Sequence, residues 1–203
     1  MMKYRVNEIF YSLQGEGMNA GRAAVFIRLS GCNLKCPFCD TDFASYDDME
    51  VEDIIREVFD TCDGEVPNLC VITGGEPSLQ LRNDLCNALH RTGMTIAVET
   101  NGTRPIHADV DFVTISPKSP FVKDADVMVF KCNEVKVIMT EDITWDEILD
   151  FEKTIEADYY YIQPCDTGFI AKNEENARNC VDFVKANPKW RLSLQQQKIL
   201  NVR

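Results

Sequence analysis

Short segments rich in branched and aromatic residues alternate along this chain with segments whose apolar residues have helical spacing. The extended segments are residues 25–29, 69–72, 95–98, 112–115, 135–139, 159–162 and 191–194, and their composition predicts strands. Strands that alternate with crossover helices pair in parallel, and ligands bind beyond the carboxyl ends of such strands. We therefore expect an α/β fold whose functional residues lie at strand ends.

Helical patterns lie between several of these strands. Apolar residues at positions 51, 54, 55, 58 and 59 form one stripe, and those at 81, 85, 88 and 89 form another, which Gly93 would end. Thr144 and Glu147 form a capping-box pattern. Asn173 is a candidate cap for a helix with an apolar stripe at Ala177, Cys180, Val181 and Val184.

The stretch from Asn101 to Asn133 lacks a long helical pattern and contains Pro105, Pro117 and Pro120. A regular eightfold barrel would therefore lack parts. We expect a partial, open (β/α) barrel with fewer than eight βα units, formed by a single domain over residues 1–203.

The charge of the chain disfavours some classes of partner. With 33 Asp and Glu residues against 21 Lys and Arg residues, the formal net charge is −12, so long-range repulsion opposes binding to nucleic acid or an anionic membrane. The sequence has neither a signal-peptide pattern nor an apolar run long enough to span a bilayer. We expect a cytoplasmic protein that acts on a small molecule.

Three of the nine cysteines form the motif C-x3-C-x2-C at Cys32, Cys36 and Cys39. Three thiolates on one short loop can bind three irons of a [4Fe–4S] cluster and leave the fourth iron open for a reactant. A structural zinc site is the alternative, but it normally needs four ligands, and the sequence has no second cysteine pair. The other cysteines are scattered singly, as small core residues often are.

The C-x3-C-x-aromatic-C loop resembles the signature of the radical S-adenosylmethionine (SAM) superfamily, with Phe38 at the position of the aromatic residue that packs against the adenine. Residues 73–77, Thr-Gly-Gly-Glu-Pro, are similar to the superfamily's GGE motif. The resemblance implies that Gly75 and Glu76 bind SAM, whose amino and carboxylate groups chelate the open iron. It also implies a barrel of the radical SAM type.

Motifs over nearly the whole chain resemble the 7-carboxy-7-deazaguanine synthase family. They are residues 11–17, Arg28, residues 39–41, 99–102, 116–118, 163–166 and 192–195. The resemblance implies conversion of 6-carboxy-5,6,7,8-tetrahydropterin to 7-carboxy-7-deazaguanine with loss of ammonia, a step towards queuosine. A 5′-deoxyadenosyl radical would take a hydrogen from C6 of the pterin, and its return would regenerate SAM.

The same resemblance implies a role for each matching site residue. Substrate contacts are expected from Leu13, Gln14, Gly15, Arg28 and Thr73, and a magnesium ligand from Thr41. Contacts with SAM are expected from Phe38, Gly75, Glu76, Ser116, Pro117, Lys118, Gln163, Pro164, Cys165 and Asp166. A one-electron donor such as flavodoxin and a homodimer are the implied partners. The end of the chain departs from the family pattern at Gln196, Gln197 and Arg203, so no contact is transferred to these residues.

Two other functions use the same cysteine loop. A glycyl-radical-enzyme activase would act on a protein, but residues 14 and 163–164 favour the pterin. A zinc or iron–sulfur binding module would not respond to SAM.

Overall fold

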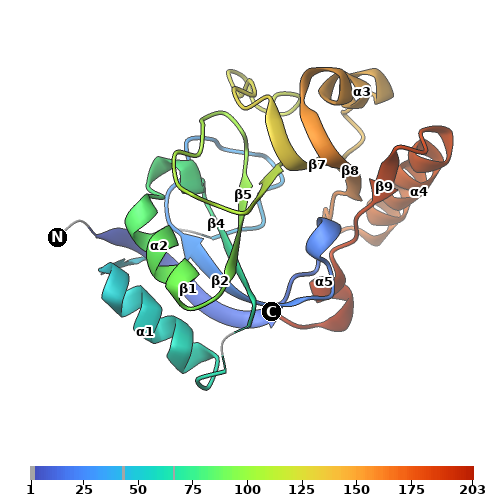
Figure 1. The fold of residues 1–203 in the computed structure, drawn as a ribbon. Coiled ribbons are helices and arrows are strands. Elements are labelled where there is room, and N and C mark those ends of the chain that lie inside the picture. Colours follow the sequence, from blue (N-terminus) through green and yellow to red (C-terminus); the bar gives the residue numbers. More distant parts are fainter. Residues whose placement is uncertain (1–2, 43, 66) are drawn as a thin grey trace.

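The computed structural model describes residues 3–42, 44–65 and 67–203. Nine strands form one sheet in the order β3-β1-β2-β4-β5-β6-β7-β8-β9 (Figure 1). The strands are β1 (Tyr4–Leu13), β2 (Ala23–Leu29), β3 (Asp47–Met49), β4 (Leu69–Gly74), β5 (Thr95–Thr100), β6 (Phe112–Ile115), β7 (Lys131–Met139), β8 (Glu156–Pro164) and β9 (Trp190–Leu192). The α-helices are α1 (Val51–Thr61), α2 (Asn83–Arg91), α3 (Trp145–Thr154), α4 (Ile170–Ala186) and α5 (Gln196–Leu200).

The pairing confirms the expected parallel sheet and adds an antiparallel edge. Six neighbouring pairs of strands are parallel: β2 with β4, β4 with β5, β5 with β6, β6 with β7, β7 with β8 and β8 with β9. The strand β1 pairs antiparallel with β2 and β3. Two connections, residues 101–111 and 116–130, contain no helix in the structure, so the α/β sheet is the open, partial barrel that the prolines predicted.

Helices cover the outer face of the sheet at its two ends (Figure 1). Alternate residues of β2, β4 and β5 form a core with α1 and α2, and alternate residues of β7 and β8 form a second core with α3 and α4. Because side chains alternate between the faces of a strand, the remaining residues point inward. Near the carboxyl ends these inward residues are polar: Arg28, Thr73, Glu99, Lys136 and Gln163.

Helices form in all four predicted segments, but Leu81 lies before α2, which begins at Asn83, and Phe59 of the first predicted stripe is exposed. Thr144 and Glu147 form the capping box of α3, and α2 ends just before Gly93, whose φ is +88°. The expected cap at Asn173 is wrong, because α4 begins at Ile170 and Asn173 lies inside its first turn. The Asn173 side chain instead accepts hydrogen bonds from the backbone N–H and the hydroxyl of Thr167, at 2.8 and 2.9 Å.

The buried face of α4 is also displaced from the predicted one. It consists of Asn176, Cys180 and Phe183, whereas Val181 is exposed.

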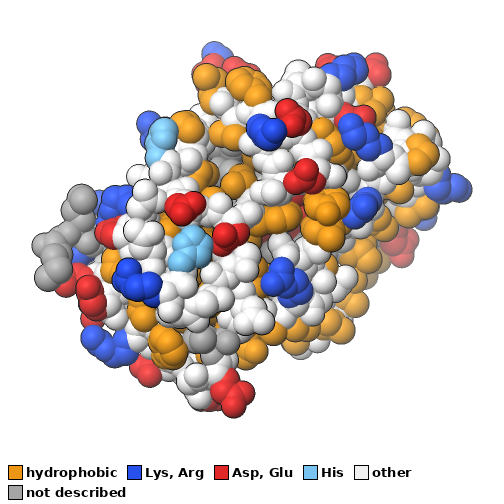
Figure 2. Space-filling view, viewed as in Figure 1, with side chains coloured by type: hydrophobic (Ala, Val, Ile, Leu, Met, Phe, Trp, Pro, Cys, Tyr) orange, Lys and Arg blue, Asp and Glu red, His pale blue; other side chains and the backbone are white. Residues whose placement is uncertain are grey.

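On the molecular face in Figure 2, Lys and Arg side chains are scattered singly among Asp and Glu. Among the helices of the described residues, none is long and apolar enough to cross a membrane.

Candidate active site

A cavity of about 980 Å³ opens at the carboxyl ends of the parallel strands. Its wall is formed by inward side chains of the sheet, by the loops that follow the strands and by the segment that contains α5. This volume is at the upper end of the range for small-molecule sites. The cavity is therefore large enough to hold a cofactor and a substrate side by side.

Most of the predicted site residues line this one cavity. They are Leu13, Gln14, Gly15, Arg28, Cys32, Cys36, Phe38, Cys39, Thr41, Thr73, Gly75, Ser116, Lys118, Gln163, Pro164, Cys165 and Asp166. Glu76 and Pro117 were also predicted, but neither is part of the cavity wall in the structure. Segments far apart in the sequence thus converge at the position expected for a parallel sheet.

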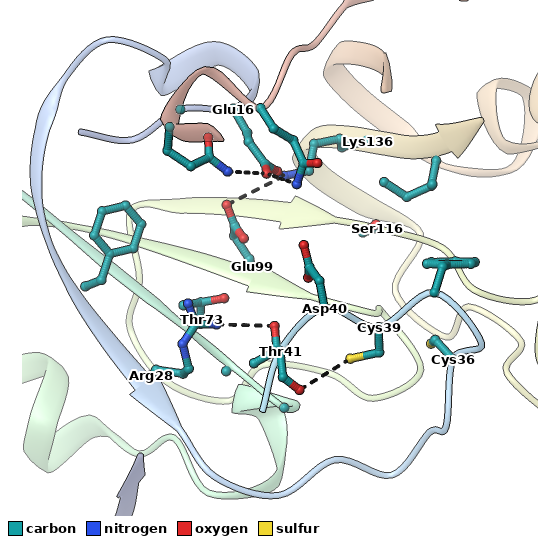
Figure 3. Close-up of a pocket in the computed structure, with 18 of the residues that line it drawn as sticks. Glu16, Arg28, Cys36, Cys39, Asp40, Thr41, Thr73, Glu99, Ser116 and Lys136 are labelled. Atoms are coloured by element: carbon teal, nitrogen blue, oxygen red, sulfur yellow. Dashed lines mark hydrogen bonds and ion pairs between the residues drawn. The ribbon is translucent and has the colours of Figure 1, made fainter. Parts of the chain in front are cut away.

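The three motif cysteines lie on the loop that follows β2, and Figure 3 shows Cys36 and Cys39 at one side of the cavity. Burial raises the pKa of the Cys32 and Cys36 thiols, and the Cys39 thiol beside them raises both further. Thiols that raise one another's pKa lie close together, so one metal cluster can bind several of them as thiolates and displace their protons. Within the described residues, no three His, Cys, Asp or Glu side chains are arranged to hold a single metal ion.

Gly74 and Gly75 allow the end of β4 to lie against the start of the cysteine loop. A Cβ atom on Gly74 would lie 2.0 Å from the carbonyl oxygen of Leu29, and one on Gly75 would lie 2.1 Å from that of Gly31. Gly74 also has a φ of +130°, which disfavours other residues. The backbone N–H groups of Gly75 and Glu76 donate to the same two carbonyls at 2.9 and 2.8 Å.

The Glu76 carboxylate is fully buried behind the cavity wall. It accepts hydrogen bonds from the Thr100 hydroxyl at 2.6 Å, the Asn101 backbone N–H at 2.8 Å and the Ser78 backbone N–H at 3.0 Å. The Asn101 amide then donates to Asn33 of the cysteine loop at 3.0 Å. Glu76 therefore supports the wall between the cysteine loop and β5, and its direct contact with SAM stays a prediction.

An ion cluster occupies another side of the cavity (Figure 3). The Lys136 ammonium forms a short ion pair with Glu16 and lies 3.7 Å from Glu99. Burial alone would raise the pKa of Glu16, but Lys136 together with hydrogen bonds from Gln195 and Gln197 lowers it to about 2. Burial would lower the pKa of Lys136, but the carboxylates of Glu16, Glu99 and Glu134 raise it. The cluster is therefore charged at neutral pH.

Amide side chains add hydrogen bonds to the same carboxylates. Gln14 donates to Glu99 at 3.0 Å, and Gln195 and Gln197 both donate to Glu16 at 3.0 Å. Burial raises the pKa of the neighbouring Glu134 carboxyl. This side of the cavity thus offers oxygen acceptors with fixed positions to a ligand that has N–H donors.

Arg28 lies apart from this cluster, at a wall formed by β1 and β2. Its Nε donates to Glu8 at 2.7 Å, and its Nη1 lies 3.4 Å from the Thr41 hydroxyl. Both the guanidinium and Thr41 line the cavity. A planar, permanently charged group beside a hydroxyl can hold the carboxylate of a ligand.

The loops after β6 and β8 complete the wall. Lys118 donates to the carbonyl and hydroxyl oxygens of Ser116 at 2.8 and 2.5 Å, and its burial lowers the pKa of the ammonium to about 8. Gln163 accepts from Ser193 at 2.7 Å. Lys198 pairs with Asp40 at 2.9 Å and with Asp166 at 3.0 Å, so the α5 segment connects the cysteine loop with the loop after β8.

Several charged residues of the cavity were not assigned from the sequence. They are Glu8, Glu16, Glu99, Lys136, Lys198 and Arg203. Lys136 carried a usable signal, because a charged residue within the apolar run 135–139 faces opposite to its buried neighbours. The others depend on contacts across long sequence separations, such as the 120 positions between Glu16 and Lys136.

Comparison with known proteins gives consistent matches. Residues 26–155 match the radical SAM superfamily. The chain is 43% identical to the 7-carboxy-7-deazaguanine synthase of Bacteroides thetaiotaomicron, with 100% of both chains covered. It is 39% identical to that of Burkholderia multivorans, with coverage of 99% and 100%. The crystal structure of QueE from Escherichia coli matches with a TM-score of 0.76 and 28% identity, over 96% of this chain and 95% of that one.

Proposed function

The chain belongs to the radical SAM superfamily and, within it, to the 7-carboxy-7-deazaguanine synthase family, and from this membership we propose how its residues serve the reaction. It is the enzyme that converts 6-carboxy-5,6,7,8-tetrahydropterin to 7-carboxy-7-deazaguanine, a step in queuosine biosynthesis. When bound, its [4Fe–4S] cluster and SAM supply the radical that takes a hydrogen from C6 of the substrate.

The arrangement of charge in the cavity is the observation that carries the substrate assignment. The pterin has a carboxylate at one end and N–H donors on its pyrimidine ring. Arg28 lies on one side of the cavity and the Glu16 and Glu99 carboxylates lie on another (Figure 3), where Gln14 donates to Glu99. We assign the carboxylate to Arg28 and the pyrimidine edge to the acceptors, with Leu13, Gly15 and Thr73 as further substrate contacts. Opposite poles would bind the substrate in one orientation.

The cofactors are assigned to the remaining walls. Cys32, Cys36 and Cys39 would hold the cluster. Phe38, Gly75, Ser116, Lys118 and residues 163–166 would hold SAM, with Glu76 and Pro117 behind them. Phe38 packs edge-to-face on Phe121, with ring centroids 4.8 Å apart, which restricts its orientation. Lys118 adds a cation beside Cys36, and a cation there favours the thiolate form that binds iron.

We propose that Mg²⁺ binds at Thr41 together with the substrate. Thr41 lines the cavity next to Arg28, and a neutral hydroxyl is too weak a ligand to hold Mg²⁺ without oxygens from another source. The substrate carboxylate near Arg28 would supply such oxygens. The carboxylates of Asp40 and Asp42, which line the same region, would offset the repulsion between Mg²⁺ and the guanidinium.

A one-electron donor and a second copy of the chain are the proposed partners. All nine cysteines are free thiols, which agrees with a reducing cytoplasm. A one-electron donor such as flavodoxin is proposed because the cluster needs an electron to cleave SAM. Ile199, Leu200 and Val202 are exposed apolar residues and are proposed to contribute to a homodimer interface. Light scattering of the wild type and Ile199→Glu tests the dimer, and activity with reduced flavodoxin tests the donor.

The test of the function is anaerobic incubation of cluster-loaded protein with 6-carboxy-5,6,7,8-tetrahydropterin, SAM, Mg²⁺ and a reductant, followed by mass spectrometry. We expect 7-carboxy-7-deazaguanine in many turnovers per SAM, because SAM is regenerated. Reductive cleavage of SAM without deazapurine would contradict the assignment and favour an activase. Cys36→Ala is the negative control.

A further inference from the structure

The cysteine loop has no regular secondary structure of its own to fix its shape. Residues 30–42 contain neither a helix nor a strand in the structure, although three thiolates of this loop are assigned to one cluster. Backbone hydrogen bonds from the Gly-Gly-Glu segment anchor the loop as far as Gly31. The side chain of Asn33, directly after Cys32, extends this anchoring by two residues.

Both ends of the Asn33 amide are hydrogen-bonded to the loop that follows β5. Its Oδ1 accepts from the Asn101 side-chain amide at 3.0 Å, and its Nδ2 donates to the Thr103 hydroxyl at 2.9 Å. The Thr103 hydroxyl donates in turn to Oδ1 of Asn101 at 2.7 Å. The three side chains therefore form a closed ring, in which each donates one hydrogen bond and accepts another, and such bonds strengthen one another.

The ring is connected to the buried Glu76 carboxylate. The backbone N–H of Asn101 donates to Glu76 at 2.8 Å, and both residues are buried. Gly102 has a φ of +75°, and the turn there lets the Thr103 backbone N–H donate to the Asn101 side chain at 2.9 Å. Asn33 itself is exposed, so its truncation would remove hydrogen bonds but no part of the apolar core.

We propose that Asn33 is a positioning residue that holds the cysteine loop at a fixed spacing from the Gly-Gly-Glu segment. The inference rests on the proposed function, in which SAM contacts both the cluster on this loop and the wall at Gly75. A ligand that must contact two surfaces binds tightly only if their spacing is set before it arrives, because otherwise part of its binding free energy is used to order the loop.

Asn33 should therefore affect the affinity for SAM and have little effect on the amount of cluster that is bound. It supplies no thiolate, and it is not among the described residues that line the cavity. Its influence on SAM would be exerted through the loop.

The test measures the iron content of reconstituted variants and their affinity for SAM without reductant, by equilibrium dialysis. Asn33→Ala should load as much iron as the wild type but bind SAM about tenfold more weakly, which is the usual scale for the loss of two hydrogen bonds. Thr103→Val, which leaves the cysteine loop unaltered, should also weaken SAM binding, whereas Thr103→Ser should retain the wild-type affinity. The double variant Asn33→Ala/Thr103→Val should match Asn33→Ala, because Thr103 acts on the loop through Asn33.

Asn133→Ala is the matched control. Asn133 also uses both ends of its amide, because it accepts from the Val113 backbone N–H at 2.9 Å and donates to Asp158 at 3.3 Å. It lies near the amino end of β7, at the edge of the sheet opposite to the cavity. This variant should leave the affinity for SAM unchanged even where it lowers Tm.

Unchanged SAM affinity in Asn33→Ala, or equal losses in Asn33→Ala and Asn133→Ala, would overturn the inference. So would a double variant whose loss is the sum of the two single losses. Should Asn33→Ala fail to load iron, Thr103→Val provides the measurement, and an unchanged affinity in that variant would have the same meaning. Failure of the proposed function would appear separately, as wild-type protein that loads iron but binds no SAM or forms no deazapurine.

Discussion

Replacing Lys136 by Met should destabilise the protein strongly, because it leaves the Glu16 carboxylate buried without its cation. Burial would raise the pKa of Glu16 from 4.5, yet Lys136, with smaller contributions from Gln195 and Gln197, lowers it to about 2. That difference corresponds to about 3 kcal/mol in the free energy of unfolding. This value lies at the lower end of the destabilisation expected when one partner of a buried ion pair is removed, which is about 3–5 kcal/mol.

The pH dependence of this effect has a defined sign. The pKa of Glu16 is depressed in the folded state, so its contribution is complete above pH 4.5 and is lost as pH falls towards 2. The pKa of Lys136 is raised, so its contribution is complete below pH 10.5 and is lost as pH rises beyond it. Without the ammonium, Glu16 must be protonated in the folded state. The deficit of Lys136→Met should therefore be largest at neutral pH and shrink below about pH 5.

The assay is thermal unfolding followed by fluorescence of the buried Trp190, with all proteins in the same cluster state. For a chain of this size, about 3 kcal/mol lowers Tm by about 6–12 °C. Lys131→Met is the matched control, because Lys131 is on the same strand but pairs with Glu156 on the surface, where the two side chains are 77% and 74% exposed. It should leave Tm unchanged. Equal losses in the two variants, or a deficit in Lys136→Met that does not shrink at low pH, would refute the reasoning.

Three further outcomes are expected. Cys36→Ala should lose the cluster, whereas Cys62→Ala, at a buried core position, should keep it. Iron and sulfide analysis of both variants tests this, and the reverse result would contradict the ligand assignment. Glu76→Gln should weaken SAM binding more than pterin binding, because the carboxylate holds Thr100 and Asn101 beside the wall that we assign to SAM. Affinities for both ligands test this, and equal losses would indicate general misfolding. Thr41→Ala should retain SAM cleavage but lose much of the Mg²⁺ dependence of deazapurine formation, whereas Thr41→Ser keeps it; a magnesium titration of both variants decides.

Local sequence patterns predicted most of the parallel sheet. Its strands are short apolar runs, and the helices that cover them have one apolar face. The capping box at Thr144 was predictable because both partners are close in sequence. The antiparallel edge formed by β1 and β3 was not predicted, because long-range pairing rather than local composition determines it. The start of α4 was missed because Asn173 bonds back to Thr167, a contact that residue type alone does not distinguish from a cap.

In the site, too, local motifs were predictable and contacts between distant residues were not. The cysteine loop and the Gly-Gly-Glu segment are short motifs, and the sequence identifies them directly. The Glu16–Lys136 pair and the Glu8 bridge between Arg28 and Arg203 join residues far apart in the chain. Local reasoning can detect one partner of such a contact, as with the inward-facing Lys136, but the sheet order must be known before the other partner can be named.

The central claim is that three cysteines hold a [4Fe–4S] cluster whose fourth iron is open to SAM within the substrate cavity. The most direct test is electron paramagnetic resonance of the reduced, cluster-loaded protein before and after SAM is added, with Cys62→Ala as a control that should behave like the wild type. A shift of the cluster signal on addition of SAM is the predicted result. A cluster signal that SAM leaves unchanged would contradict the account.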